Sequence, residues 1–514
     1  MQDPIIQTKA CRQCQTSFEI TQWDMEFYEK ISPTFAGKKF QIPTPTLCPE
    51  CRQQRRLAFR NERNLYRRTC DASGKQIISM YNPECGYKVY DQKIWWSDQW
   101  DPMSYGREFD FTKTFTEQFG ELMREMPHLS LLGVQNELSD YVNGVFAWTR
   151  SYLCFNCDYI EDCMYVQNSL RLKKSLDCLS CMNSELLYWC LVCDNCYQCN
   201  YCLSCQDCSF CYQCNDLIGK SYCVHNIQYT KAEYFEVQSK TKHGIIPSTI
   251  NDIHSHNNHD CRNIYDCWNL EDCKNCYYVY DSKDCMDFDV FGDNSSLIYE
   301  WLAIGPNSYS NIFSACCRWW STHCSYSFLI VGRSHCFWCI GLRNKQYCIF
   351  NKQYTKDDYE KTVAKIIAHM QETWERGEFF HPSLSPFGYN ETVAHEYFPS
   401  SIIEKNDNND VISYHGLPRF ARNDDGLELS QLWYKRSEYE APKPVSDKVI
   451  EGKDLPDSIA EVEDSILQFV ISCELTGKLF RIQPQELIFY RKHHIPLPRK
   501  HPDQRHLERL ALRR

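Results

Sequence analysis

The stretch CLVCDNCYQCNYCLSCQDCSFCYQC, residues 190–214, has a cysteine at every third position, nine in succession. A period of three matches neither the 3.6 residues of an α-helix nor the alternation of a flat strand. Cysteine spacings of 12 and 15 also recur, as in Cys178, Cys190, Cys202 and Cys214, and in Cys163, Cys178, Cys193, Cys208 and Cys223. Stacked repeats of this kind predict a narrow, β-helix-like β-solenoid whose coil length lies in the range of these two spacings.

A longer repeat divides the expected solenoid into two lobes. Residues 223–231, CVHNIQYTK, recur 125 positions later as CIFNKQYTK at 348–356. Each copy leads into an expected helix that caps the open end of its lobe. In the second helix, Thr355 and Asp358 form a capping box. The expected apolar stripe of that helix is Tyr359, Val363, Ile366, Ile367, Met370 and Trp374. Another capping helix is expected over 112–126.

Two C-x-x-C pairs near the N-terminus predict a zinc site. Cys11 and Cys14 form the first pair, and Cys48 and Cys51 form the second after 33 intervening residues. Zinc takes four such ligands in a tetrahedron, and each C-x-x-C turn directs two thiolates to one point. The alternative is two buried structural cysteine pairs. Between the pairs we expect a strand over 18–20 and a helix from Thr21 through Lys30.

This stretch resembles the family of probable zinc-ribbon or treble-clef domains, which have C-x-x-C, an F-x-x-x-x-x-E-x-F-Y-like middle and C-P-x-C-R-x-x-R-R. The matching residues are Cys11, Cys14, Phe18, Glu26, Phe27, Tyr28, Cys48, Pro49, Cys51, Arg52, Arg55 and Arg56, over about a tenth of the chain. The resemblance implies zinc binding and no particular activity.

Nearly the whole chain also resembles a group of large, cysteine-rich proteins of uncultivated, small-genome bacteria. The motifs that carry this resemblance are CPECR at 48–52, WWSDQWDP at 95–102, LRNKQY at 342–347, PFGYN at 386–390 and HPDQRH at 501–506. The group has no assigned activity, so the resemblance implies a layout and a zinc site.

Two other segments are similar to the zinc module but lack its ligands. In 466–514, Cys473 aligns with Cys11, whereas Thr476, His501 and Gln504 replace the other three cysteines. In 70–149, a degenerate copy of the pattern, called the worn module below, retains Cys70 but has Ser73, Asp91 and Ile94 at ligand positions. We expect both segments to be free of metal.

The cysteines that recur at every third position, here called the ladder cysteines, have three interpretations. Packing as small hydrophobes is favoured. The alternatives are a soft-metal site for Cu(I), zinc or an iron–sulfur cluster, and thiol redox exchange. A separate weak metal candidate is formed by His254, His256, His259 and Cys261, for which a polar loop is the favoured alternative.

Arginines follow the second cysteine pair, where we expect a helix over 52–68. They could contact nucleic-acid phosphates through Arg52, Arg55, Arg56, Arg60 and Arg63. A solvated face paired with acidic groups is favoured instead, because the net charge of the chain is −11.

Composition narrows the function classes. The 514 residues include 33 cysteines, an odd number, and neither a signal peptide nor a membrane-length apolar run is present. These features predict a cytoplasmic protein with reduced thiols and no membrane contact. No P-loop, dinucleotide-binding, HExxH or GxSxG motif occurs. We therefore expect a zinc-binding, non-enzymatic scaffold with a protein partner; metal storage or thiol redox chemistry, and nucleic-acid binding, are the alternatives.

The expected domain order joins these segments in a multidomain, mainly β chain. It is a zinc module (1–69), a worn module with a capping helix (70–149), solenoid lobe 1 (150–245), solenoid lobe 2 (246–376), an extended linker with an inserted loop (377–465) and a metal-free module (466–514).

Overall fold

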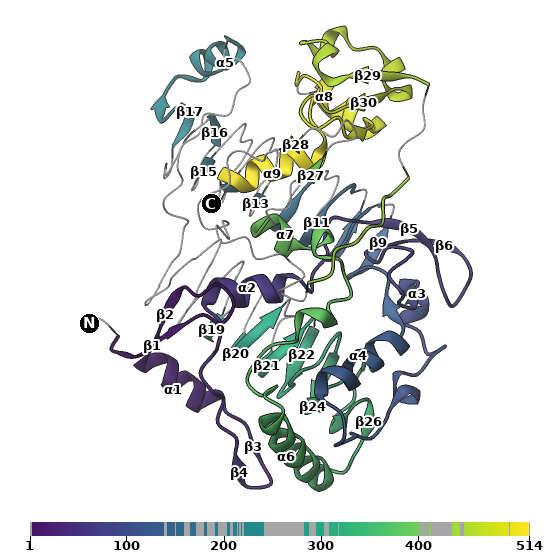
Figure 1. The fold of residues 1–514 in the computed structure, drawn as a ribbon. Coiled ribbons are helices and arrows are strands. Elements are labelled where there is room, and N and C mark those ends of the chain that lie inside the picture. The colour runs from purple at the N-terminus through teal and green to yellow at the C-terminus, as the bar shows by residue number, and fades with distance from the viewer. Residues whose placement is uncertain are drawn as a thin grey trace. The chain divides into compact units, whose positions relative to one another are not determined.

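The computed structural model has mixed helices and small sheets, and it divides the chain into two compact units (Figure 1). Unit 1 comprises Met1–Leu132, Asp252–Ser400 and Asn423–Glu438, and unit 2 comprises Gly133–Asn251, Ser401–Arg422 and Tyr439–Arg514. The structure describes residues 3–137, 141–149, 151–158, 165–170, 179–181, 191–193, 203–205, 209–212, 214, 217, 220–240, 282–286, 295–302, 308–316, 318–399, 404–405, 411–412, 434–442, 447–492 and 494–512.

Unit 1 begins with an antiparallel hairpin of β1 (Ile5–Ala10) and β2 (Ser17–Thr21), followed by α1 (Gln22–Ile31). The strand and the helix expected here are confirmed, and a reciprocal capping box of Thr21 with Asp24 begins the helix. A small hairpin of β3 (Thr34–Phe35) and β4 (Lys38–Lys39) leads on to α2 (Pro49–Leu57).

The helix expected over 52–68 is wrong beyond Leu57. The Asn61 side chain accepts a hydrogen bond from the Asn64 backbone N–H at 3.0 Å, and this turn competes with helix. The chain then forms β5 (Tyr66–Thr69), which pairs antiparallel with β6 (Gln76–Ser79).

Parallel strands form the centre of unit 1, and we call this stack of strands the ladder. They pair in chain order as β19 (Ser282–Cys285), β20 (Ser295–Leu302), β21 (Tyr309–Ala315), β22 (Arg318–Thr322) and β23 (Val331–Ser334). Ser282 is paired with Ser295, and Cys336 is paired with Cys348 where β24 (Cys336–Phe337) meets β25 (Cys348–Ile349), so the numbers of paired residues differ by 13 and by 12. The chain then turns back through β26 (Lys352–Gln353) into α6 (Lys356–Glu372).

Backbone geometry explains the period of three. From His323 to Phe350, a positive φ occurs at every third residue, at 323, 326, 329, 332, 335, 338, 341, 344, 347 and 350. Most residues that directly follow these corners are buried, namely Cys324, Ser327, Ile330, Cys336, Cys339, Leu342, Cys348 and Asn351. Successive corners are therefore three residues apart. Small side chains recur at the buried position that follows a corner.

Unit 2 has the same kind of ladder. Its seven-stranded parallel sheet runs in chain order through β9 (Gly133–Glu137), β10 (Val145–Thr149), β11 (Phe155–Asp158), β12 (Gln167–Leu170), β13 (Leu179–Cys181), β14 (Leu191–Cys193) and β15 (Leu203–Cys205). The numbers of paired residues differ by 12, as in Leu179, Leu191 and Leu203. The described sheets include no closed barrel, and a continuous two-lobed solenoid stays a prediction because many intervening residues lie outside the described part.

The two copies of the 125-residue sequence repeat have similar local structure. In unit 2, β16 (Ser209–Tyr212) pairs parallel with β17 (Ser221–Val224), which turns back into β18 (Ile227–Gln228) before α5 (Lys231–Lys240). Cys223 is paired with Gln228 there, as Cys348 is paired with Gln353 in unit 1. The two copies therefore have the same turn before their helices.

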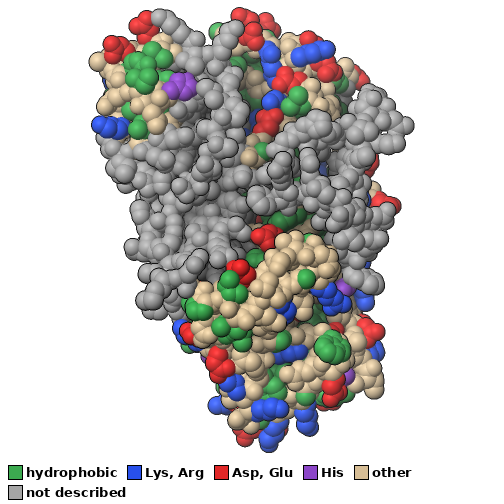
Figure 2. Space-filling model, turned by 60° about the vertical axis from the view of Figure 1, so that its left-hand side comes forward, with side chains coloured by type: hydrophobic (Ala, Val, Ile, Leu, Met, Phe, Trp, Pro, Cys, Tyr) green, Lys and Arg blue, Asp and Glu red, His purple; other side chains and the backbone are tan. Residues whose placement is uncertain are grey.

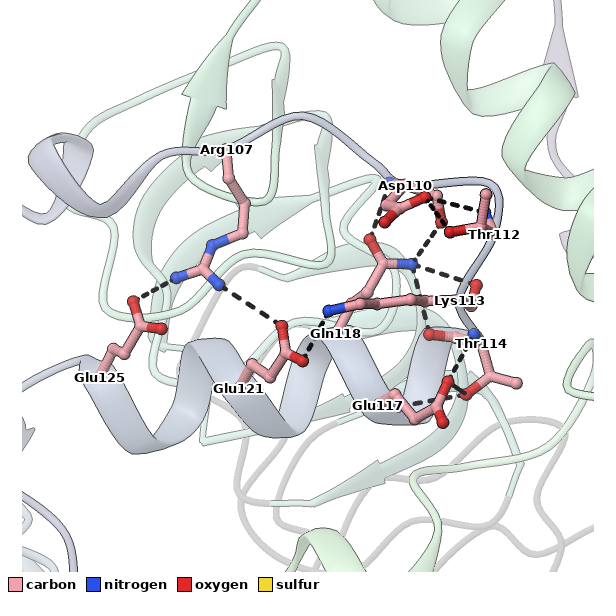
Figure 3. A network of polar contacts seen from close by, with 9 residues as sticks. All are labelled: Arg107, Asp110, Thr112, Lys113, Thr114, Glu117, Gln118, Glu121 and Glu125. Atoms are coloured by element: carbon pink, nitrogen blue, oxygen red, sulfur yellow. Dashed lines mark hydrogen bonds and ion pairs between the residues drawn. The ribbon is translucent and has the colours of Figure 1, made fainter.

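Two helices cover the ladder of unit 1. In α4 (Phe115–Glu125), Thr114 and Glu117 form a capping box, and Asp110, Gln118 and Lys113 extend the polar network around it (Figure 3). The Phe115 ring stacks on Trp338 at 4.5 Å between centroids. In α6 the expected stripe from Tyr359 to Met370 is buried.

Trp374 is the exception to the predicted stripe, because its side chain is 90% exposed. Helix α6 ends at Glu372, and Trp374 has a φ of 61°, so the chain has already left the helix. The prediction for this residue is wrong.

The remaining elements are short. In unit 1 they are β7 (Val89–Tyr90), α3 (Gln92–Trp95), β8 (His128–Leu129) and α7 (Val393–Tyr397). In unit 2 they are β27 (Glu404–Lys405), β28 (Val411–Ile412), β29 (Val449–Glu451), β30 (Val470–Ser472), β31 (Leu479–Phe480), α8 (Pro484–Lys492) and α9 (Pro502–Leu512). No helix in the described residues is both long enough and apolar enough to cross a bilayer.

Buried His128 on β8 makes stability depend on pH. Its ring nitrogens contact the Met123 carbonyl at 2.7 Å and the Tyr81 hydroxyl at 3.3 Å, and burial lowers the pKa of His128 to about 4. The unfolded chain, with a pKa near 6.5, binds the proton more readily. Stability is therefore complete above about pH 6.5 and falls toward pH 4, by up to about 3 kcal/mol.

We expect the urea midpoint of the wild type to fall between pH 7 and 4.5 more steeply than that of a His128→Gln variant. Equal slopes in the two proteins would contradict this assignment.

Candidate metal centre

The first cysteine pair lies in a tight turn between β1 and β2. The Cys11 N–H donates to the Thr16 carbonyl at 2.9 Å, and the Gln15 N–H donates to the Cys11 carbonyl at 2.9 Å. Gln15 has a φ of 60°, which reverses the chain after Cys14. These two backbone bonds direct the two thiols to the same side of the hairpin.

The second pair lies at the start of α2 and is tied to the first. Cys48 is the N-cap of α2, with Pro49 at the first turn. The Arg12 N–H donates to the Thr46 carbonyl at 3.0 Å, and the Cys48 N–H donates to the Cys11 Sγ at 3.3 Å. The positive end of the helix dipole therefore lies at the sulfurs, where it favours thiolates.

The four sulfurs converge on one point. The Sγ atoms of Cys11, Cys14, Cys48 and Cys51 all lie within 4.8 Å of one another, and those of Cys14 and Cys48 are 3.6 Å apart. Zinc–sulfur bonds of about 2.3 Å in a tetrahedron give sulfur–sulfur distances of about 3.8 Å. The side chains of Cys11, Cys48 and Cys51 are buried, and Cys14 is half-buried. The four-cysteine cluster could hold a metal ion, as predicted from the sequence.

The protonation of these thiols is strongly unequal. Hydrogen bonds from the thiols of Cys48 and Cys51 lower the pKa of Cys11, whereas hydrogen bonds to Cys11 and Cys48 raise the pKa of Cys51. Four thiolates cannot lie this close together without a cation, because their charges repel at short range in a buried site. A divalent ion with soft or borderline character fits this donor set.

This chain matches no family model, no curated protein and no solved structure.

The worn module after β5 retains the knuckle turn. The Cys70 N–H donates to the Lys75 carbonyl at 2.8 Å, and the Gly74 N–H donates to the Cys70 carbonyl at 2.9 Å. The Asp91 N–H donates to the Cys70 Sγ at 3.2 Å, as the Cys48 N–H does to Cys11. Ser73 and Ile94 leave this copy without a full ligand set.

The C-terminal module has the same frame within unit 2. The Cys473 N–H donates to the Lys478 carbonyl at 3.0 Å, and Gly477 has a φ of 66°. The Glu474 N–H donates to the Arg499 carbonyl at 3.1 Å, in the place of the bond from Arg12 to Thr46. In the described residues, only the first module brings together three or more side chains of the types that bind metal, namely Cys, His, Asp and Glu.

The arginines proposed for nucleic-acid contact are mostly inaccessible. Arg52, Arg55, Arg56 and Arg60 are buried, and Arg63 is half-buried. They are turned into unit 1, where α2 packs on β20 and α7 (Figure 1). On the face in Figure 2, positive and negative side chains are interspersed among the coloured residues. The burial of these four arginines argues against phosphate contact and against a solvated face, whereas the expected pairing with acidic groups is found for Arg55 and Arg60.

Sequence reasoning missed the acidic partners of Arg55. Its guanidinium donates to both carboxylate oxygens of Glu300, at 2.9 and 2.7 Å, and to Glu378 at 2.7 Å. Glu300 is completely buried on β20, in an otherwise mostly apolar strand. The only signal in the sequence is one carboxylate in the segment SSLIYEWL.

The sequence also predicts two other metal candidates, the histidine cluster and the ladder cysteines. His254, His256, His259 and Cys261 lie outside the described residues. The ladder cysteines whose side chains the structure describes are buried and form no disulfide, namely Cys154, Cys157, Cys214, Cys223, Cys316, Cys324, Cys336, Cys339 and Cys348.

Proposed function

We propose that the protein is a zinc-binding scaffold without catalytic activity, whose cysteine-rich ladders are turns of a two-lobed β-solenoid. The convergence of Cys11, Cys14, Cys48 and Cys51 carries the proposal. Four cysteine ligands complete the zinc shell and leave no open position for a substrate, which is typical of structural sites. The zinc ion would join the first hairpin to the start of α2, as in a zinc-ribbon or treble-clef module.

The parallel ladders support the solenoid. Successive strands pair in chain order, the numbers of paired residues differ by 12 or 13, and corners of positive φ recur every third residue in unit 1. Stacked coils of this length account for all three observations.

The ladder cysteines have a structural role in this proposal. Thiols donate to the carbonyl two residues earlier, at 3.0 to 3.6 Å, in Cys154, Cys157, Cys223, Cys324, Cys339 and Cys348. Ser314 and Ser327 do the same with their hydroxyls. In each case the residue between donor and acceptor has a positive φ. A cysteine at this position fills a narrow interior and adds a donor, which favours protonated thiols over metal storage.

This role predicts an unusual order of stability at Cys339, whose thiol contacts the carbonyls of Phe337 and Cys348. We expect Cys339→Ser to be more stable than Cys339→Val by about 1 kcal/mol, because only serine retains the donor. Urea unfolding of both variants measures the difference. A more stable valine variant would mean that the thiol is only an apolar filler.

The proposal includes a protein partner. Trp374 supports it, because this aromatic side chain is 90% exposed and tryptophan is enriched at interaction hot spots.

The experiment for the proposal as a whole is anaerobic purification, followed by metal analysis and a thiol count. We expect one zinc per chain, and ladder thiols that react only after unfolding. Several copper, zinc or iron atoms per chain would instead support metal storage, and fast-reacting ladder thiols would support redox exchange.

A further inference from the structure

The segment that follows α6 connects the metal module to the rest of unit 1. Its Glu375 carboxylate accepts hydrogen bonds from the backbone N–H groups of Phe115 and Thr116, at 2.8 and 2.9 Å, at the start of α4. The Gly377 N–H donates to the hydroxyl of Tyr326, which is on the ladder, at 3.0 Å. One short segment therefore contacts a capping helix and the ladder together.

Glu378, in the same segment, joins both halves of the metal module. Its Oε1 accepts from the backbone N–H of Thr46 at 3.1 Å and from the Thr46 hydroxyl at 2.7 Å. Thr46 lies two residues before Cys48, and its carbonyl accepts from Arg12 inside the first knuckle. The other oxygen of Glu378 accepts from Arg55 on α2 at 2.7 Å.

Arg55 continues this path into the ladder. Both carboxylate oxygens of Glu300 accept from its Nη2, and the side chains of Arg55 and Glu300 are 7% and 0% exposed. A buried carboxylate that loses the cation hydrogen-bonded to it is strongly disfavoured. The charges of Arg52 and Arg56, also on α2, stabilise the Glu300 anion in the same way. Glu300 on β20 is therefore stable as an anion only while α2 holds its arginines in place.

A bound metal ion would fix the start of α2 to the first cysteine hairpin. The helix has nine residues, too few to be stable by itself in water, and its N-cap and first turn carry Cys48 and Cys51. Without the ion, the start of α2 loses its attachment to the first knuckle, and Arg55 loses its fixed position.

From this chain of contacts, and on the basis of the proposed function, we infer that the metal site is a conformational switch for the ladder. Metal occupancy is transmitted through Thr46, Glu378 and Arg55 to Glu300. With metal bound, the backbone hydrogen bonds of the ladder strands β20 and β21 rarely open. When the metal is removed, these strands open locally.

Amide hydrogen exchange of the full-length protein tests this switch, before and after removal of the metal by a chelator. Metal content is measured first, so that a protein without bound metal refutes the proposed function separately from the switch. In the wild type we expect metal removal to speed exchange in β20 and β21 at least about tenfold. Exchange in β30 of unit 2 is the internal control and should stay within about twofold.

A double variant, Arg55→Met with Glu300→Leu, replaces the ion pair by apolar side chains of similar size and tests the path. It should still bind one metal ion, and metal removal should no longer speed exchange in β20. Unchanged exchange in the wild type after verified metal loss would overturn the inference. An equal response in the wild type and the double variant would overturn the path through Arg55. If the double variant does not fold, Thr46→Val, which removes only the hydroxyl donor to Glu378, should reduce the response, and an undiminished response would overturn the path.

Discussion

Replacing Cys48 by serine is expected to remove the metal and unfold the metal module. Cys48 supplies a sulfur to the cluster, caps α2 and donates its N–H to Cys11. Structural zinc contributes about 10–16 kcal/mol in small zinc domains, which is comparable to the whole stability of an ordinary domain. We therefore expect no bound zinc in the Cys48→Ser protein, and a lower unfolding midpoint of unit 1 in circular dichroism.

The matched control is Cys70→Ser, at the position equivalent to Cys11 in the worn knuckle. Cys70 accepts a hydrogen bond from the Asp91 N–H, which a serine hydroxyl can also accept. This variant should retain one zinc and nearly all of its stability. A Cys48→Ser protein with normal zinc content and a normal unfolding midpoint would contradict the assignment of the site.

Glu300→Ala is expected to be the most damaging change away from the cysteines. It leaves the buried Arg55 with Glu378 as its remaining close carboxylate. Burial raises the pKa of Glu300 while Arg55 opposes that shift, so the negative charge of Glu300 depends on Arg55. Breaking a buried pair on one side costs about 3–5 kcal/mol, and we expect that decrease in the free energy of unfolding.

Glu121→Ala removes a surface carboxylate of unit 1 that contacts Lys113 and Arg107 (Figure 3), and it serves as the control. Because these side chains are partly exposed, we expect no resolvable change in the urea midpoint. A similar loss of stability in the two variants would show that the Arg55–Glu300 pair has no special role.

Several short-range patterns in the sequence gave correct predictions. The C-x-x-C spacing placed four sulfurs together, and Thr21 and Thr355 were recognised as helix caps. The repeat at 223–231 and 348–356 also returned as the same turn before a helix. In these cases the residues that decide the structure are close in sequence, or are copies of one another.

The failures concern contacts between distant residues and the points at which helices end. The arginines after Cys51 read as a solvated or phosphate-binding face, because the carboxylates that bury Arg55 are 245 and 323 residues away in sequence. Trp374 fitted the helical period, but the chain leaves α6 before reaching it. The period of three in the cysteines was visible, whereas its cause, a corner of positive φ at every third residue, required coordinates.

X-ray absorption spectroscopy at the zinc edge of the full-length protein, purified without added metal, shows directly whether the four cysteines hold a zinc ion. We expect one zinc per chain, with four sulfur neighbours at about 2.3 Å and no nitrogen or oxygen bound to the metal. A protein without zinc, or a zinc ion surrounded mainly by nitrogen or oxygen, would contradict this expectation.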